Sequence, residues 1–199
     1  MAYGLLLLRA APMVLSTAAI QFDYSQYLYL RPYLELPSDH QKSNAVDSTK
    51  DKNNDVNDSR PIVNTLLGHF IHREFPAGLA AILVLYPTTW VVAGANLFLG
   101  RASAVAAAPL VPAARYLYTA GLVFSVGHMV FGPVSKDLME TIGGLGGKPP
   151  VTESRDPAKK DNLDLLKTWL RLHVTRTFVA DVPGWLCFTA AFLLSARLR

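Results

Sequence analysis

The feature that most constrains this chain is a long stretch without a single charged residue. Phe75–Leu99 reads FPAGLAAILVLYPTTWVVAGANLFL. A transmembrane helix needs ~20 mostly apolar residues to cross the hydrocarbon core of a bilayer. Leu110–Pro133 and Val174–Ala196 meet the same test, although each carries a few ionisable residues. The chain is therefore expected to cross a membrane at least three times.

The N-terminal segment Gly4–Ile20 leaves two interpretations open. It reads GLLLLRAAPMVLSTAAI, and its small residues would suit a signal-peptide cleavage site. Arg9 and Pro12 interrupt its apolar core and no basic region precedes it, which favours an uncleaved first transmembrane helix. The fold class expected is all-α: one integral membrane domain over residues 1–199, a bundle of four transmembrane helices at about 4–20, 75–99, 110–133 and 174–196.

Two polar loops separate these spans. Residues 38–60 are rich in Ser, Asp, Asn and Lys and are predicted to be disordered. Residues 143–161 are rich in Gly and Pro and are typical of a flexible linker; GGLGGKPP there lacks the spacing of a phosphate-binding loop. Because most Lys and Arg residues lie in the connections after the first and third spans, which contain these loops, the positive-inside rule places both loops in the cytosol. An endoplasmic reticulum or other internal membrane is the expected location.

Charge and cysteine content exclude several classes of function. Only 17% of the residues are charged, against ~25% in soluble proteins. The net charge of +4 comes from scattered rather than clustered basic residues, so a nucleic-acid partner is not expected. The single cysteine, Cys187, can form neither an intrachain disulfide nor a zinc site. His69 and His72 lie three residues apart but lack a carboxylate on the same face, so no metal site is predicted.

Ionisable residues nevertheless gather on one face of the fourth helix. At ~100° per residue, Trp169, His173 and Arg176 fall within ~60° of one another, and Asp181 lies ~80° beyond His173. Charged groups inside a membrane are costly and usually face the bundle interior. This face, and His128 in the middle of the third span, are therefore predicted to point inward.

Each of these residues also has a purely structural interpretation. His173 and Arg176 lie near a helix end and could extend to the lipid headgroups. Arg176 and Asp181 could form a structural ion pair, and His128 could hydrogen-bond across helices to hold the bundle together.

A resemblance to a known family adds a functional expectation. Pro133, just after the third span, and the pattern Trp169-x-x-x-His173-x-x-Arg176 resemble the small four-helix membrane family that includes fungal anthrone oxygenases. That family usually has Asn at the position of His173. The resemblance covers most of the chain outside the two polar loops. It implies a protein of fungal-type secondary metabolism, and characterised members oxidise an anthrone to the quinone with molecular oxygen and no evident cofactor.

The resemblance also implies roles for particular residues. Anthrone oxidation needs a base, for which His128 or His173 is suited, since the ordinary histidine pKa of ~6.5 is near neutrality. Arg176 would stabilise the resulting enolate, and Trp169 would stack on the aromatic substrate. Asp181 is a further catalytic candidate because it lies on the same inward polar face. His72 and Trp90 are further candidates for contacting the substrate.

Two functions remain open. The favoured one is a membrane-embedded, cofactor-independent enzyme that oxidises or otherwise converts a lipophilic polycyclic molecule by base-assisted chemistry. The alternative is a non-catalytic membrane scaffold or small-molecule carrier. A channel or transporter is less favoured, because the chain shows no internal repeat and no run of intramembrane charges. The expected partners are the lipophilic substrate and membrane lipid, and the sequence does not indicate an oligomeric state.

Overall fold

The computed structural model describes residues 3–35, 60–102, 110–147 and 161–197. Within these ranges the regular structure is entirely helical, which confirms the all-α prediction. The helices run in the order α1 (Tyr3–Leu30), α2 (Pro32–Glu35), α3 (Arg60–Ala102), α4 (Pro112–Gly127), η2 (His128–Phe131), α5 (Gly132–Gly143), α6 (Asn162–Arg176), η3 (Thr177–Asp181) and α7 (Val182–Arg197). Most of both predicted polar loops, 38–60 and 143–161, lies outside the described residues.

Four helical spans are long and apolar enough to cross a membrane. They are Tyr3–Glu35, Ile62–Phe98, Pro112–Gly143 and Asn162–Ala196. Each is longer than the apolar segment predicted from the sequence, because amphipathic turns extend the helices at the end opposite the chain termini. Local signals set two of these ends: Gly144 ends α5 with a left-handed φ of 61°, and the Asp161 side chain caps α6 by accepting from the Asp164 amide at 2.9 Å.

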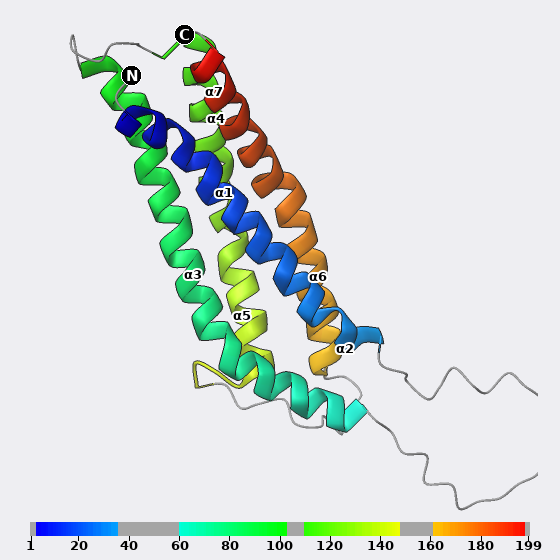
Figure 1. The fold of residues 1–199 in the computed structure, drawn as a ribbon. Helices are drawn as coiled ribbons and strands as arrows, with labels where there is room; N and C mark the ends of the chain where they lie inside the picture. Colours follow the sequence, from blue (N-terminus) through cyan, green and yellow to red (C-terminus); the bar gives the residue numbers. More distant parts are fainter. Residues whose placement is uncertain (1–2, 36–59, 103–109, 148–160, 198–199) are drawn as a thin grey trace, which may run out of the picture.

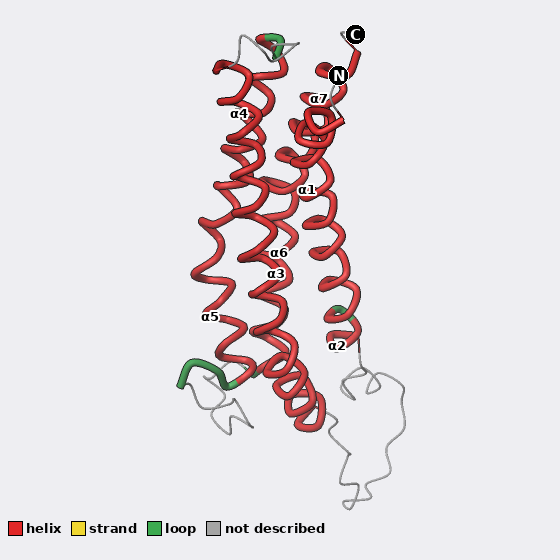
Figure 2. The backbone as a smooth tube through the Cα atoms, turned by 60° about the vertical axis from the view of Figure 1, so that its left-hand side comes forward, coloured by secondary structure: helices red, strands yellow, loops and turns green. Residues whose placement is uncertain are grey.

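The four spans form one elongated bundle. In Figure 1 the two chain termini lie at the same end, and α2 lies at the other. Figure 2 shows the helices running side by side along the whole length. The first span packs between α3 and α7, and α4 packs along α7. The fourth span therefore contacts the first and third, which brings residues distant in sequence together.

The outside of the bundle is unusually apolar. Val84, Val91, Tyr116, Val130 and Phe178 are all more than 60% exposed. Soluble monomers rarely expose large contiguous apolar surfaces, whereas a lipid-facing surface is expected to be apolar. The surface therefore agrees with the membrane-crossing length of the helices.

The interior contains two separate apolar clusters. The first lies toward α2 and includes Leu67, Ile71, Ile142, Leu166 and Trp169. The second lies toward the termini and consists of Ala93, Leu110, Ala114, Tyr118, Phe188 and Ala191. In the second cluster the Phe188 ring packs directly on Gly121, where an added Cβ would lie 2.7 Å from the ring. Small residues thus let the third and fourth spans approach closely.

Candidate functional site

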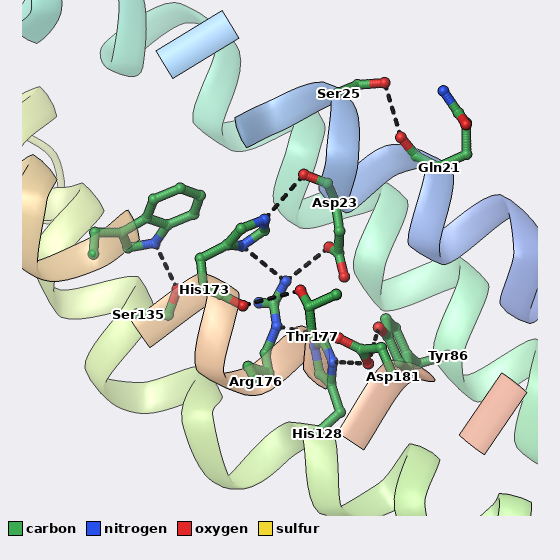
Figure 3. A network of polar contacts seen from close by, with 11 residues as sticks. Gln21, Asp23, Ser25, Tyr86, His128, Ser135, His173, Arg176, Thr177 and Asp181 are labelled. Carbon is green, nitrogen blue, oxygen red and sulfur yellow. Dashed lines mark hydrogen bonds and ion pairs between the residues drawn. The ribbon is translucent and has the colours of Figure 1, made fainter. Parts of the chain in front are cut away.

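Between the two apolar clusters, polar side chains from all four spans meet. Asp23 comes from α1, Tyr86 from α3, His128 from the start of η2, and His173, Arg176 and Asp181 from α6 and η3. All six are buried. Along each span these residues stand between those of the two clusters, so the polar layer has apolar packing on both sides. Figure 3 shows their side chains converging on Arg176 and Asp181. The predicted inward orientation of His128, His173, Arg176 and Asp181 is confirmed.

Arg176 is the centre of this layer. Its Nη2 donates to Asp23 Oδ1 at 2.7 Å and to His173 Nδ1 at 3.0 Å, and its Nε lies 3.5 Å from Asp181 Oδ2. A buried guanidinium requires compensating negative charge, and carboxylates from two different spans supply it. One structural interpretation of the sequence had Arg176 extend to the lipid headgroups. The structure shows instead that Arg176 points into the bundle.

The contacts of His173 fix its tautomer. An arginine can only donate, so Nδ1 must accept from Arg176; a carbonyl can only accept, so Nε2 must donate to the Asp23 carbonyl oxygen at 3.0 Å. The ring also stacks on Trp169, with centroids 4.6 Å apart and an interplanar angle of 19°. Both nitrogens are therefore engaged in the neutral form. These contacts hold His173 against both Arg176 and Trp169.

Asp181 and His128 form a second pair. His128 Nδ1 lies 2.7 Å from Asp181 Oδ1, and the Tyr86 hydroxyl donates to the same oxygen at 2.8 Å. The Tyr86 ring covers the His128 ring, with centroids 3.9 Å apart. With Nδ1–H donating to the carboxylate, the lone pair lies on His128 Nε2, for which the described residues provide no hydrogen-bond partner. A histidine oriented by a carboxylate in this way is the usual arrangement of a general base.

Two departures from α-helical geometry position this pair. His128 begins a short 3₁₀ segment, and Thr177–Asp181 forms a π-helical turn in which the Val182 amide donates to the Thr177 carbonyl. In an α-helix, Arg176 and Asp181 would point ~140° apart. In a π turn, residues five apart face the same side, so the turn brings Asp181 under Arg176 and toward His128.

A cavity of about 350 Å³ opens on one side of the layer. Arg176, Trp169 and Ser135 form its wall at the polar layer, and Trp169 Nε1 donates to Ser135 Oγ at 2.7 Å. The remaining wall is mostly apolar and comes from α1, α3 and α5, including Phe22, Phe75, Leu79, Ile82 and Met139. Its volume is within the ~300–1,000 Å³ typical of small-molecule sites.

Two residues predicted to contact a substrate lie away from this cavity. His72 is exposed, and its Nδ1 lies 2.9 Å from the Gly143 carbonyl, where it joins α3 to the end of α5. Trp90 donates from Nε1 to Ser125 Oγ at 2.9 Å. Neither is part of the cavity wall, and His128, His173 and Asp181 are not either; of the predicted site residues, Trp169 and Arg176 line it.

Sequence reasoning missed Asp23, Tyr86 and Ser135. Asp23 is the one acidic residue of α1, which is the signal that could have singled it out. Tyr86 and Ser135 carry no comparable signal. As for metals, the described ranges contain no group of three His, Cys, Asp or Glu residues placed to hold an ion.

Comparison with known proteins gives three fungal relatives. The chain is 32% identical over 112 residues to "Epoxidase pydX" of Acremonium sp, and the match covers 56% of this chain and 59% of the relative. It is 30% identical over 112 residues to "Probable epoxidase scpX" of Mollisia scopiformis, covering 56% and 60%. A 75-residue match to "Epoxidase gkaX" of Penicillium citrinum is 32% identical and covers 37% and 39%.

The similarity to these relatives covers only part of the chain. The chain spans about three-fifths of the length of the first two relatives. No protein-family model matches the chain, and no solved structure does. The names of all three relatives state epoxidation, not the anthrone oxidation implied by the sequence resemblance. The chain is thus similar, over about half of its length, to epoxidases from fungi.

Proposed function

We propose that this chain is a membrane-embedded enzyme that oxidises a lipophilic small molecule bound in the 350 Å³ cavity, in an internal membrane of the cell. One observation carries the proposal. Asp23 Oδ2 is buried without a hydrogen-bond partner, and Arg176 Nε and Asp181 Oδ2 meet only each other, in a 3.5 Å ion pair too loose to be a hydrogen bond; Arg176 is itself part of the cavity wall. Buried polar atoms are almost always paired, so such a cluster beside a cavity favours a site that a substrate completes.

Each part of the layer has a role in this proposal. Trp169 stacks on the unsaturated part of the substrate, and Arg176 stabilises negative charge that develops on it. The Asp181–His128 pair, which lies behind Arg176 and outside the cavity wall, is the base for a reaction that removes a substrate proton, as the anthrone-type oxidation does. Asp23 and His173 hold Arg176 in place, and Tyr86 holds Asp181.

The names of the relatives favour epoxidation as the particular reaction. Epoxidation places one atom of O₂ across a carbon–carbon double bond; the other becomes water, which takes two protons and two electrons from a reduced nicotinamide or flavin. The anthrone-type oxidation implied by the sequence resemblance instead converts CH₂ and O₂ into a carbonyl and water without an added donor. Both reactions form anionic oxygen intermediates that a buried arginine stabilises.

Metabolite profiling of the producing host tests the proposal. The gene is deleted, and the strain is complemented with the wild type, His128→Asn or His69→Asn. The asparagine at 128 can still donate to Asp181 but offers no basic nitrogen, whereas His69 is an exposed histidine outside the layer. We expect the unoxidised precursor to accumulate in the deletion strain and with His128→Asn, and to be consumed with the wild type and His69→Asn.

Two other results would contradict the proposal. Full rescue by His128→Asn would remove His128 from the chemistry. An unchanged metabolite profile in the deletion strain would favour the alternative function, a non-catalytic scaffold or small-molecule carrier.

A further inference from the structure

The cavity wall contains two charged side chains of opposite sign. Arg176 is 4% exposed and forms part of the inner end, at the polar layer. Glu74, on α3, has a side chain that is 54% exposed and therefore stands at the open end. The wall between them is dominated by aromatic and aliphatic side chains. The cavity is thus apolar along its length and polar at both ends.

A second polar group accompanies Glu74 at the open end. Gly78 lies one helical turn after Glu74 on the same face of α3. A Cβ at Gly78 would lie 3.3 Å from Gln26 Nε2, so the Gln26 amide of α1 reaches across to this turn. Glu74, Gln26 and the neighbouring Ser25 all belong to the cavity wall. The opening between α1 and α3 is therefore lined by Glu74, which only accepts hydrogen bonds, and by Gln26 and Ser25, which can donate or accept.

The carboxylate of Glu74 is only weakly engaged by other described residues. Its ion pair with the adjacent Arg73 is 3.7 Å long, and the Arg73 side chain is 88% exposed. Such exposed pairs contribute little. The acceptor oxygens of Glu74 thus remain available to a ligand at the cavity opening.

We propose that Glu74 and Gln26 select substrates that carry a hydrogen-bond donor, such as an amine, an amide N–H or a hydroxyl, at the end opposite the reacting carbon atoms. This inference rests on the proposed function, because it assumes that the cavity is the substrate site. The substrate class is then an amphiphile: an unsaturated apolar body between Trp169 and Phe75, with a donor head group at Glu74. A carboxylate head group is disfavoured, since like charges repel at close range.

Binding of three anthracene probes tests this inference without any turnover. The probes are 9-(aminomethyl)anthracene, 9-methylanthracene and 9-anthracenecarboxylate, which share one apolar body and differ in head group. Binding to the full-length protein in phosphatidylcholine vesicles is followed by energy transfer from tryptophan to anthracene. Trp169→Phe identifies the signal that comes from the cavity, because the other two tryptophans, Trp90 and Trp185, lie outside its wall.

We expect the aminomethyl probe to bind about tenfold more tightly than the methyl probe, the size expected for one charge-assisted hydrogen bond, with the carboxylate weakest. Glu74→Gln should abolish most of this preference. Glu35→Gln, which removes an exposed carboxylate on α2 outside the cavity wall, should preserve it.

Several results would overturn the inference. The first is that the wild type binds the aminomethyl and methyl probes with equal affinity. The second is that Glu74→Gln keeps the wild-type preference. The third is that Glu74→Gln loses affinity for both probes equally, which would make Glu74 structural. The proposed function fails instead in the metabolite assay, so the two failures are distinguishable.

Discussion

The ion pair between Arg176 and Asp23 provides a quantitative test of the polar layer. Among the described residues, two Arg–carboxylate pairs have the same 2.7 Å separation, Arg176–Asp23 and Arg31–Glu35. The side chains of the first pair are 4% and 2% exposed, and those of the second are 56% and 59% exposed. Burial is therefore the main difference between the two pairs. Asp23→Asn and Glu35→Gln each remove one charge while keeping the shape of the side chain.

The expected effects differ strongly. Removing one partner of a buried ion pair costs about 3–5 kcal/mol when the other charge is left uncompensated in the interior. In Asp23→Asn the Arg176 charge keeps partial compensation from Asp181, whose Oδ2 lies 3.5 Å from Arg176 Nε. Asparagine keeps an oxygen that accepts from Arg176 Nη2, so we expect the lower end, about 3 kcal/mol. At ~2–4 °C per kcal/mol for a domain of this size, Asp23→Asn should lower Tm by about 6–12 °C. Glu35→Gln should leave Tm unchanged, since solvent screens an exposed pair.

Thermal unfolding of both variants in the same detergent measures this difference. Circular dichroism reports loss of helix, and a second scan in high salt shows whether solvent ions screen either pair. Equal Tm values for Asp23→Asn and the wild type would refute the reasoning, because Asp23 would then contribute no charge to the pair. A drop in Glu35→Gln as large as in Asp23→Asn would also refute it, since burial would then not be the cause.

Three further predictions follow from the same geometry. His173→Asn should retain activity in the complementation assay, because an amide can both donate to the Asp23 carbonyl and accept from Arg176. His173→Leu should lose activity, because leucine can do neither. If both variants are inactive, His173 is the base. Tyr86→Phe removes a hydrogen bond to the Asp181 carboxylate and should lower the unfolding free energy by about 1.5–3 kcal/mol, measured by denaturation in detergent; an unchanged value would mean that the bond does not contribute. Ile82→Phe narrows the cavity and should weaken binding of 9-methylanthracene with little change in Tm, whereas unchanged binding would place the probe elsewhere.

The fold was predictable from sequence because membrane-crossing length is a local property. A run such as 75–99 needs no knowledge of its neighbours to be identified as a transmembrane helix. The extensions of the helices were not predicted, since turns such as those around His69 and His72 are polar on one side and lack a simple hydropathy signal. The predicted face of Trp169, His173 and Arg176 followed from 3.6-residue periodicity alone, which α6 obeys.

The site was predictable only where its geometry is regular and local. Asp181 joins the layer through a π turn that no periodicity argument contains, and His128 meets it from a 3₁₀ segment. Asp23 contacts Arg176 across 153 positions of sequence, so the pairing depends on how the first and fourth spans pack. Tyr86 becomes important only because its hydroxyl reaches Asp181.

The unpaired atoms of the layer separate the enzymatic from the purely structural interpretation. A polar layer selected only to hold four helices together gains most when every buried donor and acceptor is satisfied, because each unsatisfied group costs about 1–3 kcal/mol. This layer instead satisfies Asp181 Oδ1 twice, from Tyr86 and His128, while Oδ2 of the same carboxylate has only a 3.5 Å ion pair with Arg176 Nε and no hydrogen bond. A ligand that binds only the folded state and supplies those missing contacts stabilises the protein by mass action. Ligand-dependent stabilisation that requires Asp181 is therefore a consequence of the enzymatic interpretation, and a layer that serves only to join helices has no reason to show it.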